Sequence, residues 1–145
     1  MTETRSTTPP HMFLILCAVL GAASGCSDLH ETSRTGAVHY VQIRDQISPQ
    51  TLYVNVGDEV RWQNFRDGPV NVGILEHKKL DQVSCQKGFM SFGAIQDLVT
   101  IKPEQYASLC FAQTGTVHYN VWMEPDDPKG TMSPTATIRV SEAAP

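Results

Sequence analysis

From Ala37 onward, apolar and polar residues alternate along the chain with a period close to two. This period is typical of β-strands that bury one face and expose the other. Turn-forming pairs interrupt the alternation, and Ser48-Pro49 and Gly57-Asp58 are the clearest of them. Strands are expected around Val41 and Ile43, Leu52 to Val56, Val60 and Trp62, Val70 to Ile74, residues 98–101, Leu109 and Phe111, residues 117–121 and residues 136–140. Seven or eight short strands without a long helix predict an all-β fold, a Greek-key β-sandwich.

One long segment, residues 77–95, breaks this alternation. Its sequence, HKKLDQVSCQKGFMSFGAI, has no clean period of either two or 3.6 residues. We therefore expect a long and partly helical excursion between two strands of the sandwich.

The first 36 residues differ in character from the remainder of the chain. Residues 12–25, MFLILCAVLGAASG, form an apolar segment of signal-peptide length that is too short to span a bilayer. Its end, Ala23-Ser24-Gly25-Cys26, resembles the lipobox of bacterial lipoproteins. The resemblance implies a signal peptide over residues 1–25, a lipid on Cys26 and a tether over residues 26–36. Simple secretion and an uncleaved anchor are the alternatives, and Met12 is an alternative start.

The lipidated cysteine would connect the protein to a membrane, because more than one acyl chain gives stable anchoring. Ser27 follows Cys26, where an aspartate would be associated with inner-membrane retention. The rule for this class of lipoprotein therefore implies an exported protein at the outer membrane, facing the periplasm. Residues 37–145 are expected to form the single folded domain.

Composition excludes some functions for this domain. The chain has 145 residues, of which 18% are charged, and a net charge of −4, which leaves no basic face for nucleic acid. The sequence shows no H-E-x-x-H motif, no glycine-rich phosphate loop and no recognisable nucleophile–base pair. We therefore expect a protein that is not an enzyme.

The four cysteines fall into two groups. Cys17 lies in the signal core and Cys26 is the lipid site, which leaves Cys85 and Cys110 in the mature chain. Two cysteines in an exported domain favour one disulfide, with two free buried thiols as the alternative. Leu109 and Phe111 are apolar and are expected to point into the core. Cys110 lies between them in the same strand, so its side chain is expected to point outward.

Three stretches resemble the cupredoxins, the plastocyanin-like blue copper family. They are SPQTLYVNVGDEVRWQNFRDGPVNVGILE at 48–76, TGTVHYNV at 114–121 and GTMSPTATIRV at 130–140. The matching positions include Pro49, Gly57-Asp58, Val60, Trp62, Asn64 and Pro69. The resemblance covers most of residues 37–140 and implies the same kind of Greek-key sandwich.

The resemblance also identifies the positions at which the family binds copper. Type 1 copper is held by two imidazoles and one thiolate in a plane, with a weak axial methionine. The three planar positions are occupied here by Val70, Val121 and Glu124, while Met132 is a candidate for the axial position or a core-filling residue. Valine has no lone pair to donate. We therefore expect a degenerate member of the family without type 1 copper, in which buried valines close the former site.

Other side chains leave copper binding through non-standard ligands open as an alternative. His118 has the parity of the solvent face, His77 begins a lysine-rich loop, and His39 shares the parity of a buried strand face. Glu124 and the nearby acids Asp126 and Asp127 could offer oxygens to a hard cation, although a solvated loop is the simpler interpretation.

The functional expectation is a non-enzymatic binding or interaction module of the cell envelope that needs no cofactor. Trp122 and Met123 follow the vacated copper position at Val121 and, if exposed, would form an apolar patch for an envelope protein partner. Packing of Trp122 on a neighbouring loop is equally compatible with the sequence. The alternative function is copper binding or electron transfer.

Overall fold

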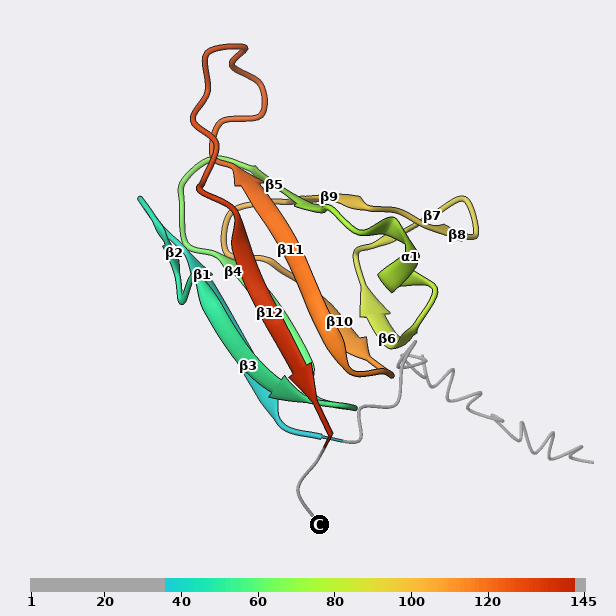
Figure 1. The fold of residues 1–145 in the computed structure, drawn as a ribbon. Helices are drawn as coiled ribbons and strands as arrows, with labels where there is room; N and C mark the ends of the chain where they lie inside the picture. Colours follow the sequence, from blue (N-terminus) through green and yellow to red (C-terminus); the bar gives the residue numbers. More distant parts are fainter. Residues whose placement is uncertain (1–35, 143–145) are drawn as a thin grey trace, which may run out of the picture.

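The structure, a computed structural model, describes residues 36–142 and contains two five-stranded sheets packed face to face (Figure 1). The first sheet has the strand order β2-β1-β4-β10-β6, and its strands are Ile47–Ser48, Val38–Ile43, Glu59–Asn64, Tyr106–Phe111 and Val83–Lys87. The second sheet has the order β3-β12-β11-β5-β9, with strands Thr51–Asn55, Ala136–Ser141, Gly115–Trp122, Val70–Ile74 and Leu98–Ile101. The predicted all-β sandwich is confirmed.

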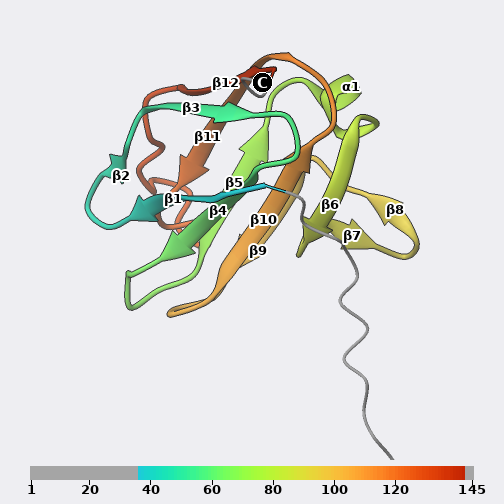
Figure 2. The same cartoon turned by 90° about the horizontal axis from the view of Figure 1, so that it is seen from below.

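Each sheet contains one parallel pair among antiparallel neighbours. Strand β1 runs parallel to β4, with Val41 opposite Trp62, and β12 runs parallel to β3, with Ile138 opposite Leu52. The chain therefore leaves the first sheet after β2, forms β3 in the second sheet and returns as β4. These crossings bring residues that are distant in sequence into one layer (Figure 2).

The core between the sheets is aromatic at its centre. Trp62, Tyr119 and Phe89 are fully buried. The Trp62 ring packs edge-on against Tyr119, with centroids 5.5 Å apart, and against Phe89 at 5.7 Å. Edge-to-face aromatic pairs of this kind stabilise a core beyond the area that they bury.

The excursion over residues 77–95 is partly helical, as expected, but it also contains three short strands that were not predicted. Its helix, α1 (His77–Leu80), has four residues, after which β6 joins the first sheet. The short strands β7 (Met90–Ser91) and β8 (Ala94–Ile95) then form a separate hairpin. Strand β6 pairs with one neighbour, β10. Strand β6 lies at the edge of its sheet and has polar residues beside the buried Cys85, so its sequence shows no clear alternation of hydrophobic side chains. The sequence therefore did not predict this strand.

The tight turn predicted at Gly57-Asp58 is present and is fastened by the Asp58 carboxylate. Gly57 has φ of 85°, and Asp58 accepts backbone N–H bonds from Asn55 (2.9 Å) and Ala37 (2.8 Å). The Nε2 atom of His39 lies 2.8 Å from the same carboxylate. Burial raises the pKa of Asp58, but the bonds from Asn55, His39 and Ala37 outweigh burial and hold the pKa below its ordinary value.

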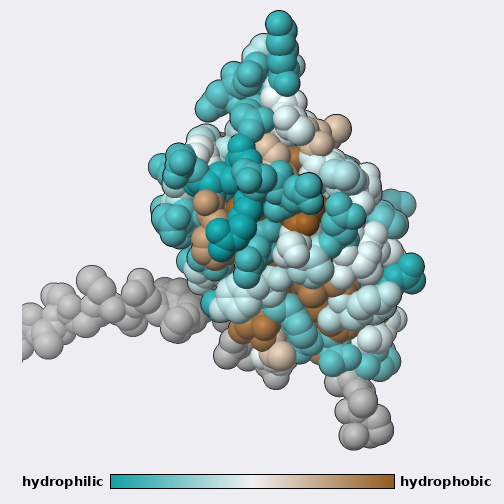
Figure 3. Space-filling model, turned by 90° about the vertical axis from the view of Figure 1, so that its left-hand side faces the viewer, coloured by the Kyte–Doolittle hydropathy of each residue, from teal (hydrophilic) through white to brown (hydrophobic). Residues whose placement is uncertain are grey.

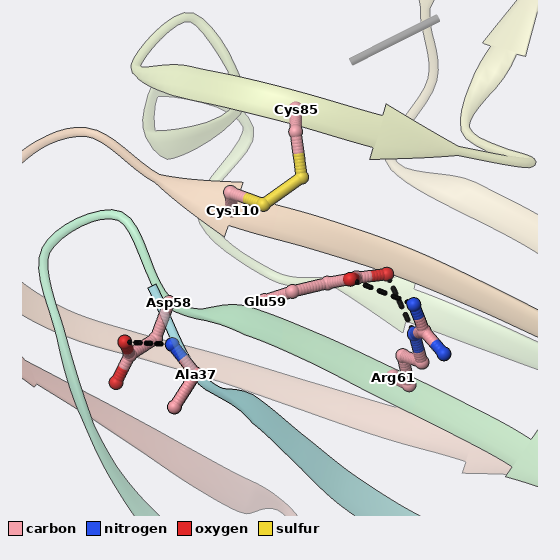
Figure 4. The surroundings of a disulfide bond; sticks show 6 residues. All are labelled: Ala37, Asp58, Glu59, Arg61, Cys85 and Cys110. Atoms are coloured by element: carbon pink, nitrogen blue, oxygen red, sulfur yellow. Dashed lines mark hydrogen bonds and ion pairs between the residues drawn. A yellow bond between two sulfur atoms is a disulfide. The ribbon is translucent and has the colours of Figure 1, made fainter. Parts of the chain in front are cut away.

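A disulfide joins Cys85 of β6 to Cys110 of β10, as the cysteine count favoured (Figure 4). The two residues lie directly opposite each other, with Cα atoms 4.8 Å apart. Cys110 was expected to turn outward, but it is fully buried, and the disulfide and the adjoining strand β4, which carries Glu59, lie beside it.

The predicted signal peptide, the lipid site Cys26 and the tether up to residue 35 lie outside the described residues. Within residues 36–142, no helix is long and apolar enough to cross a membrane.

Candidate functional site

The residues at the positions that the sequence resemblance assigns to copper ligands gather at one end of the sandwich. Val70 begins β5 and is paired with Ile101 of β9, while Val121 near the end of β11 is paired with Val72. The loops 65–69 and 123–135 leave the sheets at this end (Figure 1). We call these two loops and the strand ends that carry them the closed end.

The two valines are part of the hydrophobic core. Val70 and Val121 both have an exposed fraction of 0%, and Met123 has 4%. All three belong to the core cluster between the sheets. Complete burial of a valine side chain stabilises a fold by roughly 1.5–3 kcal/mol. The arrangement therefore supplies hydrocarbon packing where the family resemblance implies metal ligands.

Glu124, at the third planar position, holds the loop in place. Its Oε1 lies 2.5 Å from Nη2 of Arg66, and its Oε2 accepts the N–H of Thr131 at 2.9 Å. The loop is tightened further by a bond from the Gly130 N–H to the carbonyl of Asp127. A Cβ on Gly130 would lie 2.2 Å from the carbonyl oxygen of Glu124, so the loop needs glycine there.

Met132 does not lie with the buried valines. Its exposed fraction is 51%, and it forms an isolated β-bridge with Trp122. The next residue, Ser133, is buried, and its hydroxyl oxygen accepts the N–H of Val121 at 2.9 Å. Because neighbouring residues in an extended chain point to opposite faces, inward Ser133 places Met132 outward. Met132 therefore neither fills the core nor offers an axial ligand in this arrangement.

The residues at the closed end do not fit type 1 copper. Two planar positions carry side chains without a donor atom, the third carries a carboxylate engaged with Arg66, and the thioether is exposed. Across residues 36–142, no group of three or more His, Cys, Asp or Glu side chains could hold a metal ion.

The three described histidines each face a different carboxylate. His39 is bonded to Asp58, His118 Nδ1 to Glu76, and His77 Nδ1 lies 3.8 Å from Asp97. His118 exposes 42% of its side chain, as its parity predicted, but is paired as well as solvated.

Burial raises the pKa of Glu76, while hydrogen bonds from the backbone and side chain of His118 outweigh burial and lower the pKa below its ordinary value. The three histidines therefore form separate pairs with carboxylates rather than one shared site.

The expected patch of Trp122 and Met123 is not formed, because Met123 is buried in the core. Trp122 is partly buried, and its ring lies over Gly73 of β5, where an added Cβ would approach the ring to 2.7 Å. Trp122 therefore packs on a neighbouring strand, whereas the alternative interpretation had placed it on a neighbouring loop.

Two adjoining shallow hollows lie over the closed end. One, of about 430 Å³, is lined by Arg66, Gly68, Pro69, Met123, Glu124, Pro125, Asp126 and Asp127. The other, of about 390 Å³, is lined by Arg44, Asp45, Phe65, Arg66, Asp67 and Gly68. Arg66 and Gly68 line both hollows. The role of Arg66 could not be predicted from the sequence, because its partners Glu124 and Asp45 are distant along the chain.

Comparisons with known proteins found similarity in three dimensions alone. No family model matches the chain, and no curated protein matches it. Among solved structures, a reduced Cu(I) form of an amicyanin variant at pH 4 is 24% identical, with a TM-score of 0.49 over 75% of this chain and 86% of that chain. An oxidised amicyanin variant is 26% identical, with a TM-score of 0.49 over 73% of this chain and 83% of that chain. The sandwich assignment rests on the observed sheets themselves.

Proposed function

We propose that this chain is a cupredoxin-like lipoprotein of the cell envelope that holds no type 1 copper and serves as a non-enzymatic binding module. The observation that carries the proposal is the complete burial of Val70 and Val121 in the core, at the positions where the resemblance implies copper ligands. Further support comes from the order of the cupredoxin-like motifs in the sequence. These motifs occur in strands and turns of one sandwich, which supports the proposal that the chain has a cupredoxin-like fold.

The envelope part of the proposal rests on the sequence around Cys26. A lipid on this residue would attach the domain to the outer membrane, with an envelope protein as a further partner. Replacing Cys26 by alanine should abolish incorporation of a labelled fatty acid and leave an unprocessed or soluble species. A wild-type protein without label would contradict the lipoprotein assignment.

The copper part of the proposal is tested by metal analysis of protein purified from a copper-supplemented periplasm. We expect no stoichiometric copper, and no intense visible band when Cu(II) is added, because that band requires a thiolate ligand. The alternative function, copper held by non-standard ligands, would instead give stoichiometric binding. Replacing His77 and His118 by alanine would then show whether the surface histidines are responsible.

A gain-of-function variant tests whether the positions have been identified correctly. Val70→His combined with Val121→Cys and Glu124→His restores two imidazoles and a thiolate, and should add a blue or green copper absorption. The matched control keeps Val121 and changes the other two positions, and it should lack the thiolate band. A folded triple variant without any such band would contradict the assignment of the positions.

A further inference from the structure

The hairpin of β7 and β8 is built around an unusual turn. Met90 pairs with Ile95 and Ser91 with Ala94, which leaves Phe92 and Gly93 as a two-residue loop. Both loop residues have positive φ, 50° for Phe92 and 80° for Gly93. This is the backbone pattern of a type I′ turn, in which asparagine or aspartate followed by glycine is the usual sequence.

Phenylalanine at the first position of this turn does not serve the fold. A bulky residue in the left-handed region is a steric outlier. The side chain of Phe92 also gains nothing by burial, because its exposed fraction is 107%, and Met90 beside it is 46% exposed. A residue that is unfavourable in its backbone conformation and unpacked in its side chain suggests selection for contact with something outside the domain.

The base of the hairpin is fixed firmly to the sandwich. Phe89 is fully buried with its ring edge-on to Trp62, and its carbonyl accepts the N–H of Gln96 at 2.7 Å. Gly88, with φ of 87°, turns the chain where a Cβ would touch Ala107. The hairpin projects from the side of the sandwich in both ribbon views (Figures 1 and 2). Phe92 is thus presented outward on an anchored support.

The tip is also free of charge. Residues 88–96, GFMSFGAIQ, contain no ionisable side chain and lie between Lys87 and Asp97. The closed end differs from the hairpin, because the loop that projects from it is hydrophilic. This loop follows β11 and projects at the top of Figure 1, and the same projection is coloured as hydrophilic at the top of Figure 3. The uncharged tip of the hairpin could enter an apolar phase without carrying a charge with it.

We propose that the hairpin tip, with Phe92 leading and Met90 beside it, inserts shallowly into the headgroup–acyl boundary of a phospholipid bilayer. A protein partner of ordinary size would bury roughly 800 Å² on each side, which a two-residue tip does not offer. A bilayer needs no complementary surface, and aromatic side chains favour its interface. Backbone groups at the hairpin edges limit insertion to this shallow depth.

The domain would be held near such a surface by its own anchor, a step that rests on the proposed lipid at Cys26. Ten residues, 27–36, separate this cysteine from the domain. Even fully extended they span roughly 35 Å. An apolar tip with weak intrinsic affinity is thereby kept at high effective concentration beside the membrane.

The test uses full-length protein, purified from cells and reconstituted into vesicles of phosphatidylethanolamine and phosphatidylglycerol with or without brominated acyl chains. Phe92→Trp places a fluorophore at the tip, and Tyr53→Trp places one on the far edge strand β3, at a side chain 69% exposed. Wild-type protein gives the background from Trp62 and Trp122. We expect brominated lipid to quench the added fluorescence of Phe92→Trp and to leave that of Tyr53→Trp unchanged.

A second pair of variants separates the aromatic side chain from the position of the probe. Met90→Trp should be quenched by brominated lipid, and Met90→Trp with Phe92→Asn should lose that quenching, because asparagine suits the turn but not the lipid interface. Equal quenching of Phe92→Trp and Tyr53→Trp, or none for both, would overturn the inference. So would crosslinking of a photoreactive residue at position 92 to a protein rather than to lipid in intact cells.

Fatty-acid labelling of the same preparations tests the lipid anchor at Cys26 independently of membrane insertion by the hairpin. Label without quenching of Phe92→Trp leaves the lipoprotein proposal standing and overturns the hairpin inference. Quenching without label supports the hairpin and contradicts the lipid anchor.

Discussion

The closed end and the β7–β8 hairpin use hydrophobic residues in opposite ways. At the closed end, Val70 and Val121 are completely buried and Met123 is 4% exposed. In the hairpin, Met90 is 46% exposed and Phe92 is fully exposed. The first arrangement is explained by stability, since buried hydrocarbon side chains stabilise the core. The second is not, so the hairpin is the better place to look for contact with another surface.

The comparison is sharpest for two phenylalanines three positions apart, Phe89 and Phe92. Phe89→Ala should lower the free energy of unfolding by about 3–5 kcal/mol, because it removes a buried ring packed on Trp62. Phe92→Ala should change it by less than about 0.5 kcal/mol, as for other surface substitutions. Urea unfolding followed by the fluorescence of Trp62 and Trp122 measures both. Similar losses for the two variants would mean that the tip is packed and would remove the contrast.

The disulfide stabilises the region from which the hairpin projects, because it joins the edge strand β6, which leads into the hairpin, to β10. Cys85→Ala with Cys110→Ala opens a loop whose ends are 25 residues apart in sequence. The chain-entropy model gives a loss of roughly 3–3.5 kcal/mol. Urea unfolding of the oxidised wild type and the double variant measures the difference.

Two thiols that react with an alkylating agent in the folded, oxidised wild type would contradict the pairing. A larger loss of hydrogen-exchange protection in β6 than in β5 would show that the effect is local to the hairpin side.

The sandwich could be predicted from sequence because burial of alternate side chains is a local pattern. Val41 with Ile43, and Val117 with Tyr119, are buried as the period of two requires. Strands β6, β7 and β8 were missed, since their pairing depends on a disulfide, a turn and one neighbouring strand rather than on alternating hydrophobic residues.

At the candidate site, the sequence predicted which positions correspond to the copper ligands of the family that it resembles, but not what surrounds these positions. The ion pair between Arg66 and Glu124 joins residues 58 positions apart, which no local pattern reveals. The patch prediction failed at the end of β11, because Met123 follows the parity of buried Val121 into the core and Trp122 is partly buried over Gly73. The exposure of Phe92 follows from the pairing of Met90 with Ile95, and pairing register is a tertiary property.

Both regions depend on a folded sandwich, and Asp58 contributes to the loss of stability of that sandwich at low pH. Its folded pKa is below the ordinary value, so its stabilisation is complete above the unfolded pKa and is lost as the pH falls toward the folded pKa. Asp58→Asn should cost about 1.5–3 kcal/mol at neutral pH, because hydrogen bonds to a charged group are replaced by weaker ones.

Urea midpoints measured from pH 7 downward check this. The wild type should lose stability more steeply than Asp58→Asn on acidification, and the two curves should approach each other at low pH. Parallel curves would show that the carboxylate does not carry this part of the pH dependence.

A second substitution at Phe92 should have a small effect of the opposite sign, a gain in stability. Asparagine adopts the left-handed conformation more readily than phenylalanine, so Phe92→Asn should raise the free energy of unfolding by up to about 1 kcal/mol. Glu104, with φ of 60°, is the matched control, because Glu104→Asn relieves the same kind of backbone conformation away from the hairpin. Urea unfolding should show comparable small gains for both variants, while only Phe92→Asn changes contact of the tip with lipid. A clear loss of stability in Phe92→Asn would mean that the phenylalanine is there for the fold, and the contrast between the hairpin and the closed end would disappear.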